Sequence, residues 1–539
     1  MTASKSLRFA IGDNDGPMRS LAYYRVVSGA LTGLDGIPVE IEVTVMPGLP
    51  NFEITGRGDS AIRESRDRVR AAILHSGFEF PKGRVVASYA PASLPKQGSA
   101  FDLPLALAVL AASSQVVRPQ NLPSSACFGE LALNGRVKPV SGVLGRLLAL
   151  REQGIRHVIG PRDGIIEARA VNSLTYEGVD TLKEAVRRFA GVKGQQCSES
   201  DTEVSPKAAP LFTLIDMIKG QEEGIRACLI AAAGWHPLLI MGAPGCGKTM
   251  LASSLPQILP PLTDEESLEV SRIYSAARLM ETSCGLIVDR PFRHPHHSVT
   301  TAALIGGGVT PQPGECTLAH RGVLFLDELT GVSPRVLDAL REPMESRTIH
   351  LARADWAVDY PADFLLVAAC NPCRCGYLLE PNGLCRCDDA MVRRHLTRIS
   401  GPLMDRFDLT VMLTRVETGN LFDTKEIANK IKKGERIRTQ VKAAWEFRNN
   451  RTKNDSSLLR NRHMPASDLA QALQIDRDAL RLASTLADTS LLSVRSFYSI
   501  LRVARTIADL DQRDLVKNTD IAEAHHYRGQ LPFARTGEI

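Results

Sequence analysis

Residues 242–249 read Gly-Ala-Pro-Gly-Cys-Gly-Lys-Thr, which is the G-x-x-x-x-G-K-[ST] spacing of a phosphate-binding loop. The apolar residues 238–241, Leu-Leu-Ile-Met, stand directly before it, and this order predicts a strand, a glycine loop and a helix. Backbone N–H groups of such a loop converge on one cavity, and the helix brings its positive dipole end there. We predict that the triphosphate of ATP binds Gly242, Ala243, Pro244, Gly245, Cys246, Gly247, Lys248 and Thr249, and that Thr249 also holds Mg²⁺.

Two carboxylates follow a second apolar stretch. Residues 323–326 are Val-Leu-Phe-Leu, and Asp327 and Glu328 come directly after them. A buried central strand would deliver both acids to its carboxyl end. We expect Asp327 to orient Mg²⁺ beside Thr249, and Glu328 to activate the attacking water. An apolar strand that ends in Asp-Glu is common by itself, so this assignment depends on the phosphate loop.

An amide and an arginine complete the predicted nucleotide site. The apolar residues 365–370 precede Asn371, which would hold the attacking water, although asparagine often simply ends a strand. Residues 401–408, Gly-Pro-Leu-Met-Asp-Arg-Phe-Asp, place Arg406 in an apolar and acidic turn. Supplied across a subunit boundary, Arg406 can neutralise charge on the γ-phosphate. Asp405 and Asp408 could instead hold it in a structural ion pair.

Four of the eleven cysteines lie within fifteen residues. They form two C-x-C pairs separated by nine residues. Four thiolates on two tight turns can close a tetrahedral Zn²⁺ site, and a site without an open position is structural. Unrelated thiols and a redox pair are the alternatives. We predict zinc at Cys373, Cys375, Cys385 and Cys387.

Length, composition and charge limit the class of protein to which the chain can belong. The chain has 539 residues, more than one core usually holds, so two to four domains are expected. No apolar run of eighteen residues occurs, and residues 1–16 lack the apolar core of a signal peptide, so we expect a cytoplasmic protein that does not enter a membrane. The net charge of +5 is too small to argue for nucleic-acid binding by itself.

The pattern along the chain predicts an α/β protein of several parts. Strands and helices alternate around the phosphate loop, as a parallel sheet requires, whereas helical patterns follow it. The expected parts are a polar extension (1–23), an α+β domain (24–190), a polar linker (191–210), an ATPase core (211–416) and a helical domain (417–539).

The predicted nucleotide residues stand in the order that AAA+ ATPases use. Residues 292–298 (Phe-Arg-His-Pro-His-His-Ser), 303–308 (Ala-Leu-Ile-Gly-Gly-Gly), 311–315 (Pro-Gln-Pro-Gly-Glu) and 318–322 (Leu-Ala-His-Arg-Gly) resemble the magnesium-chelatase-like AAA+ proteins. Within that group the chain resembles the bacterial ComM/YifB family, from about residue 24 to residue 528. The resemblance implies a ring, expected to be a hexamer of this chain, that binds single-stranded and branched DNA. It also implies that ATP drives branch migration during natural transformation.

The same resemblance assigns further residues. Arg495 matches the sensor 2 position, which contacts nucleotide, with Arg505 as a weaker alternative. A hairpin is expected at residues 347–360. In such rings these hairpins face the pore, so Arg347, His350 and Arg353 would meet DNA phosphates, although a solvated hairpin would have the same sequence.

Residues 91–104 resemble the Lon-protease-type domain of this family. A working Lon protease needs a serine and a lysine base. Ser99 lies near the serine position, but residues 142–146, where the lysine is expected, contain none. Lys138 comes too early and Lys96 is in the wrong segment. We therefore expect a proteolytically inactive scaffold.

Two other functions compete with the DNA motor. One is an ATPase subunit that helps insert Mg²⁺ into a porphyrin, but its resemblance would cover only the central part of the chain. The other is a Lon-like ATP-dependent protease, which the missing lysine disfavours.

Overall fold

The computed structural model describes residues 22–55, 60–91, 99–117, 125–192, 213–280, 285–353, 356–380, 384–415, 433–452 and 473–528. By contacts between residues, the chain divides into two compact units, residues 1–199 and 200–539. The predicted linker from residue 193 onward, and the predicted extension up to residue 21, lie outside the described residues. No helix among the described residues is long and apolar enough to cross a membrane.

The N-terminal unit is built on a mixed seven-stranded sheet with the order β3-β4-β2-β1-β5-β8-β9. The β1–β2 and β2–β4 pairs are antiparallel, and the other pairs are parallel. Alternating residues of β2 are buried, as the period-two pattern of residues 39–45 predicts. The strands are β1 (Ala22–Thr32), β2 (Asp35–Met46), β3 (Asn51–Thr55), β4 (Arg84–Ala90), β5 (Ser125–Cys127), β8 (His157–Pro161) and β9 (Thr175–Val179), with a small hairpin of β6 (Glu130–Leu131) and β7 (Val137–Lys138).

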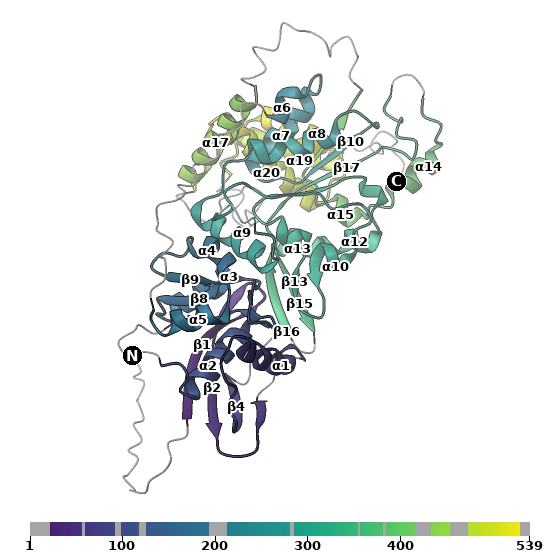
Figure 1. Cartoon of the computed structure of the whole chain (residues 1–539). Helices are drawn as coiled ribbons and strands as arrows, with labels where there is room; N and C mark the ends of the chain where they lie inside the picture. The colour runs from purple at the N-terminus through teal and green to yellow at the C-terminus, as the bar shows by residue number, and fades with distance from the viewer. Residues whose placement is uncertain are drawn as a thin grey trace, which may run out of the picture. The chain divides into compact units, whose positions relative to one another are not determined.

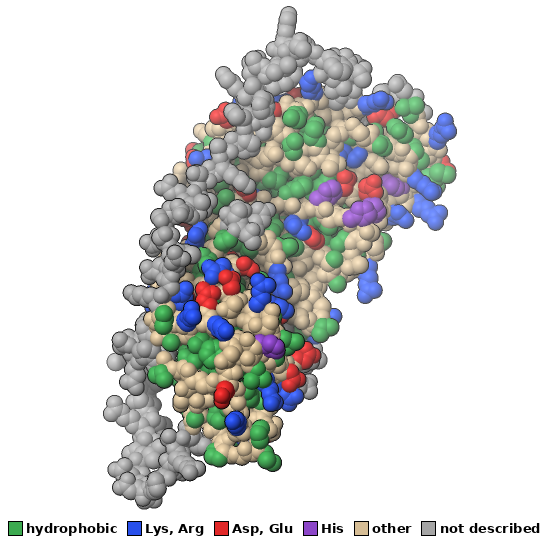
Figure 2. All heavy atoms as spheres, viewed as in Figure 1, with side chains coloured by type: hydrophobic (Ala, Val, Ile, Leu, Met, Phe, Trp, Pro, Cys, Tyr) green, Lys and Arg blue, Asp and Glu red, His purple; other side chains and the backbone are tan. Residues whose placement is uncertain are grey.

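Helices complete the core of this unit. Almost every residue of α2 is buried because its sequence is apolar on all sides. On the face drawn in Figure 2, lysine and arginine side chains of the described residues are interspersed with acidic ones. The helices are α1 (Ser60–His75), α2 (Asp102–Ala112), α3 (Val143–Glu152), α4 (Ile165–Ala168) and α5 (Leu182–Phe189).

The second unit contains a five-stranded sheet in which every pair is parallel, with the order β11-β14-β17-β10-β18. Its three central strands are buried along their whole length, which suits their unbroken apolar sequences. Their carboxyl ends therefore meet at one edge, which we call the carboxyl edge. The strands are β10 (Leu238–Gly242), β11 (Phe292–Arg293), β14 (Val323–Leu326), β17 (Leu365–Cys370) and β18 (Leu409–Leu413).

Helices α7 and α8 pack on this sheet and are followed by shorter helices and two hairpins. The hairpins pair β12 with β13 and β15 with β16. The remaining elements before residue 416 are α6 (Leu214–Met217), α7 (Glu222–Gly234), α8 (Lys248–Ile258), α9 (Asp264–Ala276), α10 (Thr301–Ile305), β12 (Gly306–Gly307), β13 (Gln312–Pro313), α11 (Glu315–Leu318), α12 (Pro334–Ala339), α13 (Arg341–Ser346), β15 (Thr348–Arg353), β16 (Trp356–Pro361), α14 (Asp389–Leu396) and α15 (Gly401–Met404).

The C-terminal helices share one core with the ATPase sheet. They are α17 (Lys433–Arg451), α19 (Arg477–Thr489), α20 (Val494–Leu510) and α21 (Asn518–Arg528). In Figure 1 the yellow-green helices α17 and α20 lie beside the teal helix α7, against which both pack. Buried residues of all these helices belong to the same cluster as those of β10 and β18. The region expected as a helical domain is thus part of the second compact unit.

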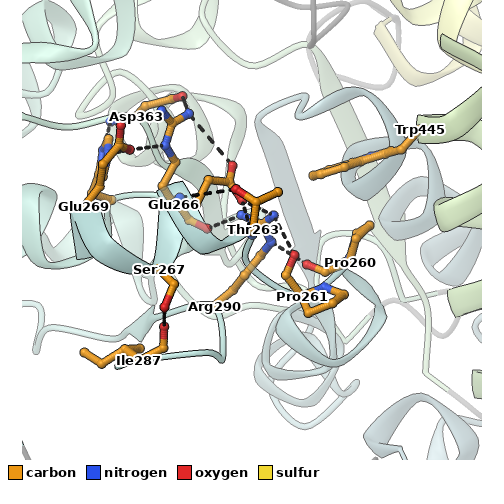
Figure 3. A network of polar contacts seen from close by, with 12 residues as sticks. Pro260, Pro261, Thr263, Glu266, Ser267, Glu269, Ile287, Arg290, Asp363 and Trp445 are labelled. Atoms are coloured by element: carbon orange, nitrogen blue, oxygen red, sulfur yellow. Dashed lines mark hydrogen bonds and ion pairs between the residues drawn. The ribbon is translucent and has the colours of Figure 1, made fainter. Parts of the chain in front are cut away.

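A buried arginine connects the sheet, α9 and a C-terminal helix. The guanidinium of Arg290 donates to Glu266 at 2.8 Å and to three backbone carbonyl oxygens. Its guanidinium carbon also lies 5.6 Å from the ring centroid of Trp235 and 5.3 Å from that of Trp445. Figure 3 shows this network, with Trp445 entering from α17. Burial lowers the pKa of Arg290, an effect that Glu266 opposes.

Candidate functional site

The phosphate-loop sequence forms the turn between β10 and α8, at the carboxyl edge. Gly245 and Gly247 have φ angles of +79° and +94°, which favour glycine. A Cβ atom on either would meet nothing within 4 Å, so the space in front of the loop is open. The ammonium of Lys248 donates to the carbonyl oxygens of Gly242 at 2.8 Å and Ala243 at 2.9 Å. The loop can therefore receive phosphates from its open side, with Lys248 already beside them.

The expected Mg²⁺ ligands lie together at this edge. The hydroxyl of Thr249 donates to Oδ2 of Asp327 at 2.9 Å, and the backbone N–H of Glu328 donates to Oδ1 at 2.8 Å. Hydroxyl and carboxylate oxygens are the ligands that Mg²⁺ prefers. Thr249 and Asp327 therefore fit a shared magnesium ion.

Glu328 lies beside a histidine that the sequence analysis did not select. Its backbone is left-handed, with φ +49° and ψ +48°, and two-thirds of its side chain is exposed. Nδ1 of His297 is 3.6 Å from Oε2 of Glu328. Figure 2 shows histidine and acidic side chains side by side on the face of this unit where Figure 1 labels α15. The Phe-Arg-His-Pro-His-His-Ser motif was the available signal, but it does not reveal which acid the histidine meets.

Asn371 lies next to the phosphate loop. Its Oδ1 accepts a hydrogen bond from Lys248 at 3.0 Å. Its backbone oxygen is 3.1 Å from Nε2 of His395, which is also 3.3 Å from the hydroxyl of Thr330. Burial lowers the pKa of His395, so its neutral form is favoured. Lys248, Thr249, Asp327 and Asn371, predicted from separate stretches of sequence, thus converge on one place.

Arg406 lies near the opposite edge of the sheet. It precedes β18, and the backbone N–H groups of Asp408 and Leu409 both donate to Pro237, which precedes β10. The phosphate loop follows the other end of β10. Arg406 is only 7 % exposed and donates to Pro402 O and Glu345 Oε1, both at 2.6 Å. Of the two acids proposed as its alternative partners, Asp405 lies 3.7 Å from Arg528 and Asp408 pairs with His236 at 2.9 Å.

Arg495 lies in the first turn of α20 and shares a partner with Arg406. Its Nη1 donates to the same oxygen, Oε1 of Glu345, at 2.8 Å. The alternative, Arg505, is fully buried and donates to Asp509 and to three backbone carbonyl oxygens. Arg505 therefore has a structural role, and Arg495 remains the candidate for nucleotide contact.

The four predicted cysteines form one cluster, with all four sulfurs within 4.8 Å of one another. The sulfur of Cys373 is 3.3 Å from that of Cys375 and 3.7 Å from that of Cys385. Tetrahedral zinc with bonds of about 2.3 Å places its sulfurs about 3.8 Å apart, so the donor set fits zinc. The backbone N–H of Tyr377 lowers the pKa of Cys375 to about 6, which favours the thiolate that a metal needs.

The cysteine loop also touches the nucleotide site. A Cβ atom added to Gly376 would lie 2.6 Å from Cδ of Pro244 in the phosphate loop and 3.8 Å from Cγ of Asn371. Gly376 has a φ of +88°, so other residues are disfavoured there on two counts.

The three predicted DNA residues lie on or beside the antiparallel hairpin of β15 and β16. Arg347 starts the hairpin, and Arg353 lies over the ring of Trp356, 6.0 Å from its centroid. Nδ1 of His350 is 2.7 Å from the carboxylate of Asp359 on the facing strand. That hydrogen bond raises the pKa of His350, although Asp359 compensates the resulting charge.

Comparison with known proteins finds three family models that match successive parts of the chain. Family models match residues 41–164 (Subunit ChlI of Mg-chelatase), 215–421 (Magnesium chelatase, subunit ChlI) and 432–528 (Magnesium chelatase, subunit ChlI C-terminal). The chain is 38 % identical to the protein YifB of Escherichia coli over 500 residues, which cover 93 % of this chain and 96 % of YifB. It is 37 % identical to the competence protein ComM of Haemophilus influenzae over 515 residues, or 94 % and 97 % of the two chains.

The chain belongs to the ComM/YifB family of magnesium-chelatase-like AAA+ proteins. Membership in this family implies ATPase activity, and it suggests that ATP and Mg²⁺ are used. The parallel sheet with its phosphate loop agrees with that class.

The N-terminal unit brings a serine and a lysine to one glutamate. The chain is 29 % identical to the Lon protease of Methanosarcina barkeri over 177 residues, or 30 % of this chain and 22 % of that protease. Ser99 donates to one oxygen of Glu130, and Lys138 is 3.3 Å from the other. Although burial acts to raise the pKa of Glu130, the hydrogen bonds from Ser99 and Lys138 lower it overall. A carboxylate whose pKa is lowered is a weaker base than a free one.

Proposed function

We propose that this chain is an ATP-driven DNA motor that works as a ring, expected to be a hexamer. On this proposal, it promotes branch migration on single-stranded and branched DNA while incoming strands recombine during natural transformation. The name of the Haemophilus relative, a competence protein that matches nearly the whole chain, supports the pathway. The main support for a motor is that the expected nucleotide residues lie at two opposite edges of one sheet.

The carboxyl edge would bind ATP and prepare water for attack. Lys248 would move from the loop carbonyls and Asn371 to the phosphates, and Thr249 and Asp327 would hold Mg²⁺. When bound, that ion neutralises charge on the β- and γ-phosphates. Glu328 would accept a proton from the attacking water, and the side-chain amide of Asn371 would orient that water. The backbone of Glu328 is in the left-handed region and its side chain is exposed. The carboxylate can therefore turn toward the water without a rearrangement of the core.

The arginines near the other edge would act on the next subunit. The five residues of β18 separate the turn at Arg406 from the level of the phosphate loop, and the four steps between them span about 13 Å at about 3.3 Å per step. A guanidinium cannot cover that distance through a packed sheet. Arg406 would therefore neutralise the γ-phosphate of a neighbouring chain, and Arg495, bound to the same glutamate, would act with it.

The hairpin of β15 and β16 would contact DNA. Arg347 and Arg353 supply positive charge for phosphates, and Trp356 lies beside Arg353. His350 is a weaker contact because Asp359 already pairs with it. The indole N–H of Trp356 donates to the carbonyl oxygen of Val309, so this hairpin and the loop between β12 and β13 are joined.

A structural zinc ion would keep the loop after Asn371 in place. Cys373 follows Asn371 by two residues, and Gly376 lies against Pro244. By fixing this loop, bound zinc would hold both the amide and one wall of the phosphate loop.

The test is ATP hydrolysis and strand exchange by the purified full chain with a synthetic four-way junction. We expect DNA to stimulate hydrolysis and ATP to drive migration of the junction, both lost in Lys248→Ala. Wild-type protein that hydrolyses ATP without DNA stimulation or strand movement rejects the proposal. ATP-dependent insertion of Mg²⁺ into porphyrin, or casein degradation that requires Ser99, would instead assign the competing functions.

A further inference from the structure

Glu345 joins two distant arginines through a single oxygen. Its Oε1 accepts from Arg406 at 2.6 Å and from Arg495 at 2.8 Å. Glu345 lies on α13, Arg406 follows α15, and Arg495 lies on α20, so one carboxylate connects three separate elements.

Three arginines place positive charge around Glu345. Although burial acts to raise the pKa of Glu345, the hydrogen bond from Arg495 and the positive charges of Arg406, Arg495 and Arg341 lower it overall. The Nε atoms of Arg341 and Arg406 are buried and have no hydrogen-bond partner among the described residues. Burial and the positive charges of Arg495 and Arg341 lower the pKa of Arg406, and the negative charge of Glu345 opposes that shift. Without Glu345, the guanidinium groups of Arg406 and Arg495 would repel each other.

Glu345 is also two residues from the start of the β15–β16 hairpin. The hydroxyl of Ser346 donates to the carbonyl oxygens of Glu342 at 2.9 Å and Thr348 at 2.7 Å. Arg347 then turns the chain with a φ of +61°, and its carbonyl oxygen accepts from the backbone N–H of Ala362 at 2.7 Å. These hydrogen bonds connect the end of α13 directly to the first residues of the hairpin.

We propose that Glu345 is a positioning residue that holds Arg406 and Arg495 as a pair and links that pair to the β15–β16 hairpin. The inference rests on the proposed function, in which both arginines serve a neighbouring nucleotide and the hairpin binds DNA. DNA that displaces the hairpin shifts α13, and Glu345 then changes the orientation of both guanidinium groups. Hydrolysis in one subunit thereby responds to DNA bound by the next.

The test compares Glu345→Gln with Glu342→Gln in the full chain. Both changes remove one negative charge from α13, but the Glu342 carboxylate is exposed, and the hydrogen bond from Ser346 goes to the backbone oxygen of Glu342 instead of its side chain. We expect Glu345→Gln to lower kcat for ATP by about 10- to 100-fold, as misplacement of a catalytic group does. The KM for ATP should stay within about twofold because ATP binds at the other edge, and DNA stimulation should be lost. Glu342→Gln should retain both activities.

Mixed rings give a second measurement that a merely structural role would not change. A Lys248→Ala subunit lacks its own nucleotide site but donates an intact arginine pair, whereas a Glu345→Gln subunit has the reverse defect. An equal mixture should hydrolyse ATP faster than either variant alone. Melting temperatures of both variants close to that of the wild type show that neither is simply unfolded.

The outcomes separate this inference from the proposed function. Normal kcat and DNA stimulation in Glu345→Gln, while Arg406→Ala loses activity, overturn the role of Glu345 alone. A loss of the same size in Glu342→Gln also overturns it, because any charge change on α13 would then suffice. Full activity in Arg406→Ala overturns the trans-acting arginine itself.

Discussion

Replacing Arg290 by alanine should destabilise the ATPase unit by about 3 kcal/mol. Removing one partner of a buried ion pair typically costs about 3–5 kcal/mol, because the other partner remains buried and unpaired. The side chain of Arg290 is almost fully buried, and its loss would also leave three carbonyl oxygens without this donor. The lower end of the range applies because Glu266 would still have a positively charged neighbour. This neighbour is Arg321, whose Nη1 lies 4.0 Å from Oε1 of Glu266.

Differential scanning calorimetry of the full chain measures this effect. A unit of 340 residues (200–539) shifts its melting temperature by about 2 °C for each kcal/mol, so we expect a fall of about 6 °C. Arg290→Lys should be intermediate, since it keeps the charge but loses the planar fork and the stacking on Trp235 and Trp445.

Arg481→Ala is the matched control. Arg481 pairs with Asp478 on α19, but its side chain is 82 % exposed. Exposed pairs contribute about 0–1 kcal/mol, so its melting temperature should change by no more than about 2 °C. Equal shifts for Arg290→Ala and Arg481→Ala would refute the argument that burial makes the Arg290 network stabilising.

Three further predictions concern the proposed ATP and metal sites. Lys248→Ala should abolish ATP binding in an equilibrium assay with fluorescent nucleotide; wild-type affinity would contradict its assignment to the phosphates. Glu328→Gln should bind ATP normally but hydrolyse it about 10²- to 10⁴-fold more slowly, the usual range for loss of a general base, and unchanged turnover would exclude that role. The purified chain should contain one zinc ion by atomic absorption. Cys375→Ser should lose this metal and also much of the affinity for ATP, because Gly376 in the cysteine loop contacts Pro244 in the phosphate loop. Full ATP affinity in the metal-free variant would show that the two sites are independent.

The part of the site that follows buried strands was predictable from the sequence. Unbroken apolar runs before Gly242, Asp327 and Asn371 required buried parallel strands, and parallel strands end at the same edge. The convergence of Lys248 with Asn371 and of Thr249 with Asp327 follows from that geometry.

The partners of the polar residues were not predictable in the same way. Nothing in the spacing joins Glu345 to Arg406 and Arg495, because the three come from elements whose packing depends on the whole core. The same holds for His297 beside Glu328 and for Glu130 between Ser99 and Lys138. Each contact is made across loops whose length and direction carry no periodic signal.

The C-terminal region shows a related limit. Its helical character was predictable from apolar spacing, and the described part of it consists of α17, α19, α20 and α21. The pattern reveals that one side of a helix is buried but not which surface covers it. Here the cover is α7 and the ATPase core, so the predicted third domain shares its interior with the second.

The bond between Trp356 and Val309 provides a built-in optical reporter. The chain has three tryptophans, and Trp235 and Trp445 both lie against Arg290, far along the sequence from the hairpins. Trp356 alone among them donates its indole N–H to the loop between β12 and β13. The part of the emission that is lost in Trp356→Phe therefore reports on the contact between the hairpin and that loop, and stopped-flow fluorescence can monitor this contact without an added dye.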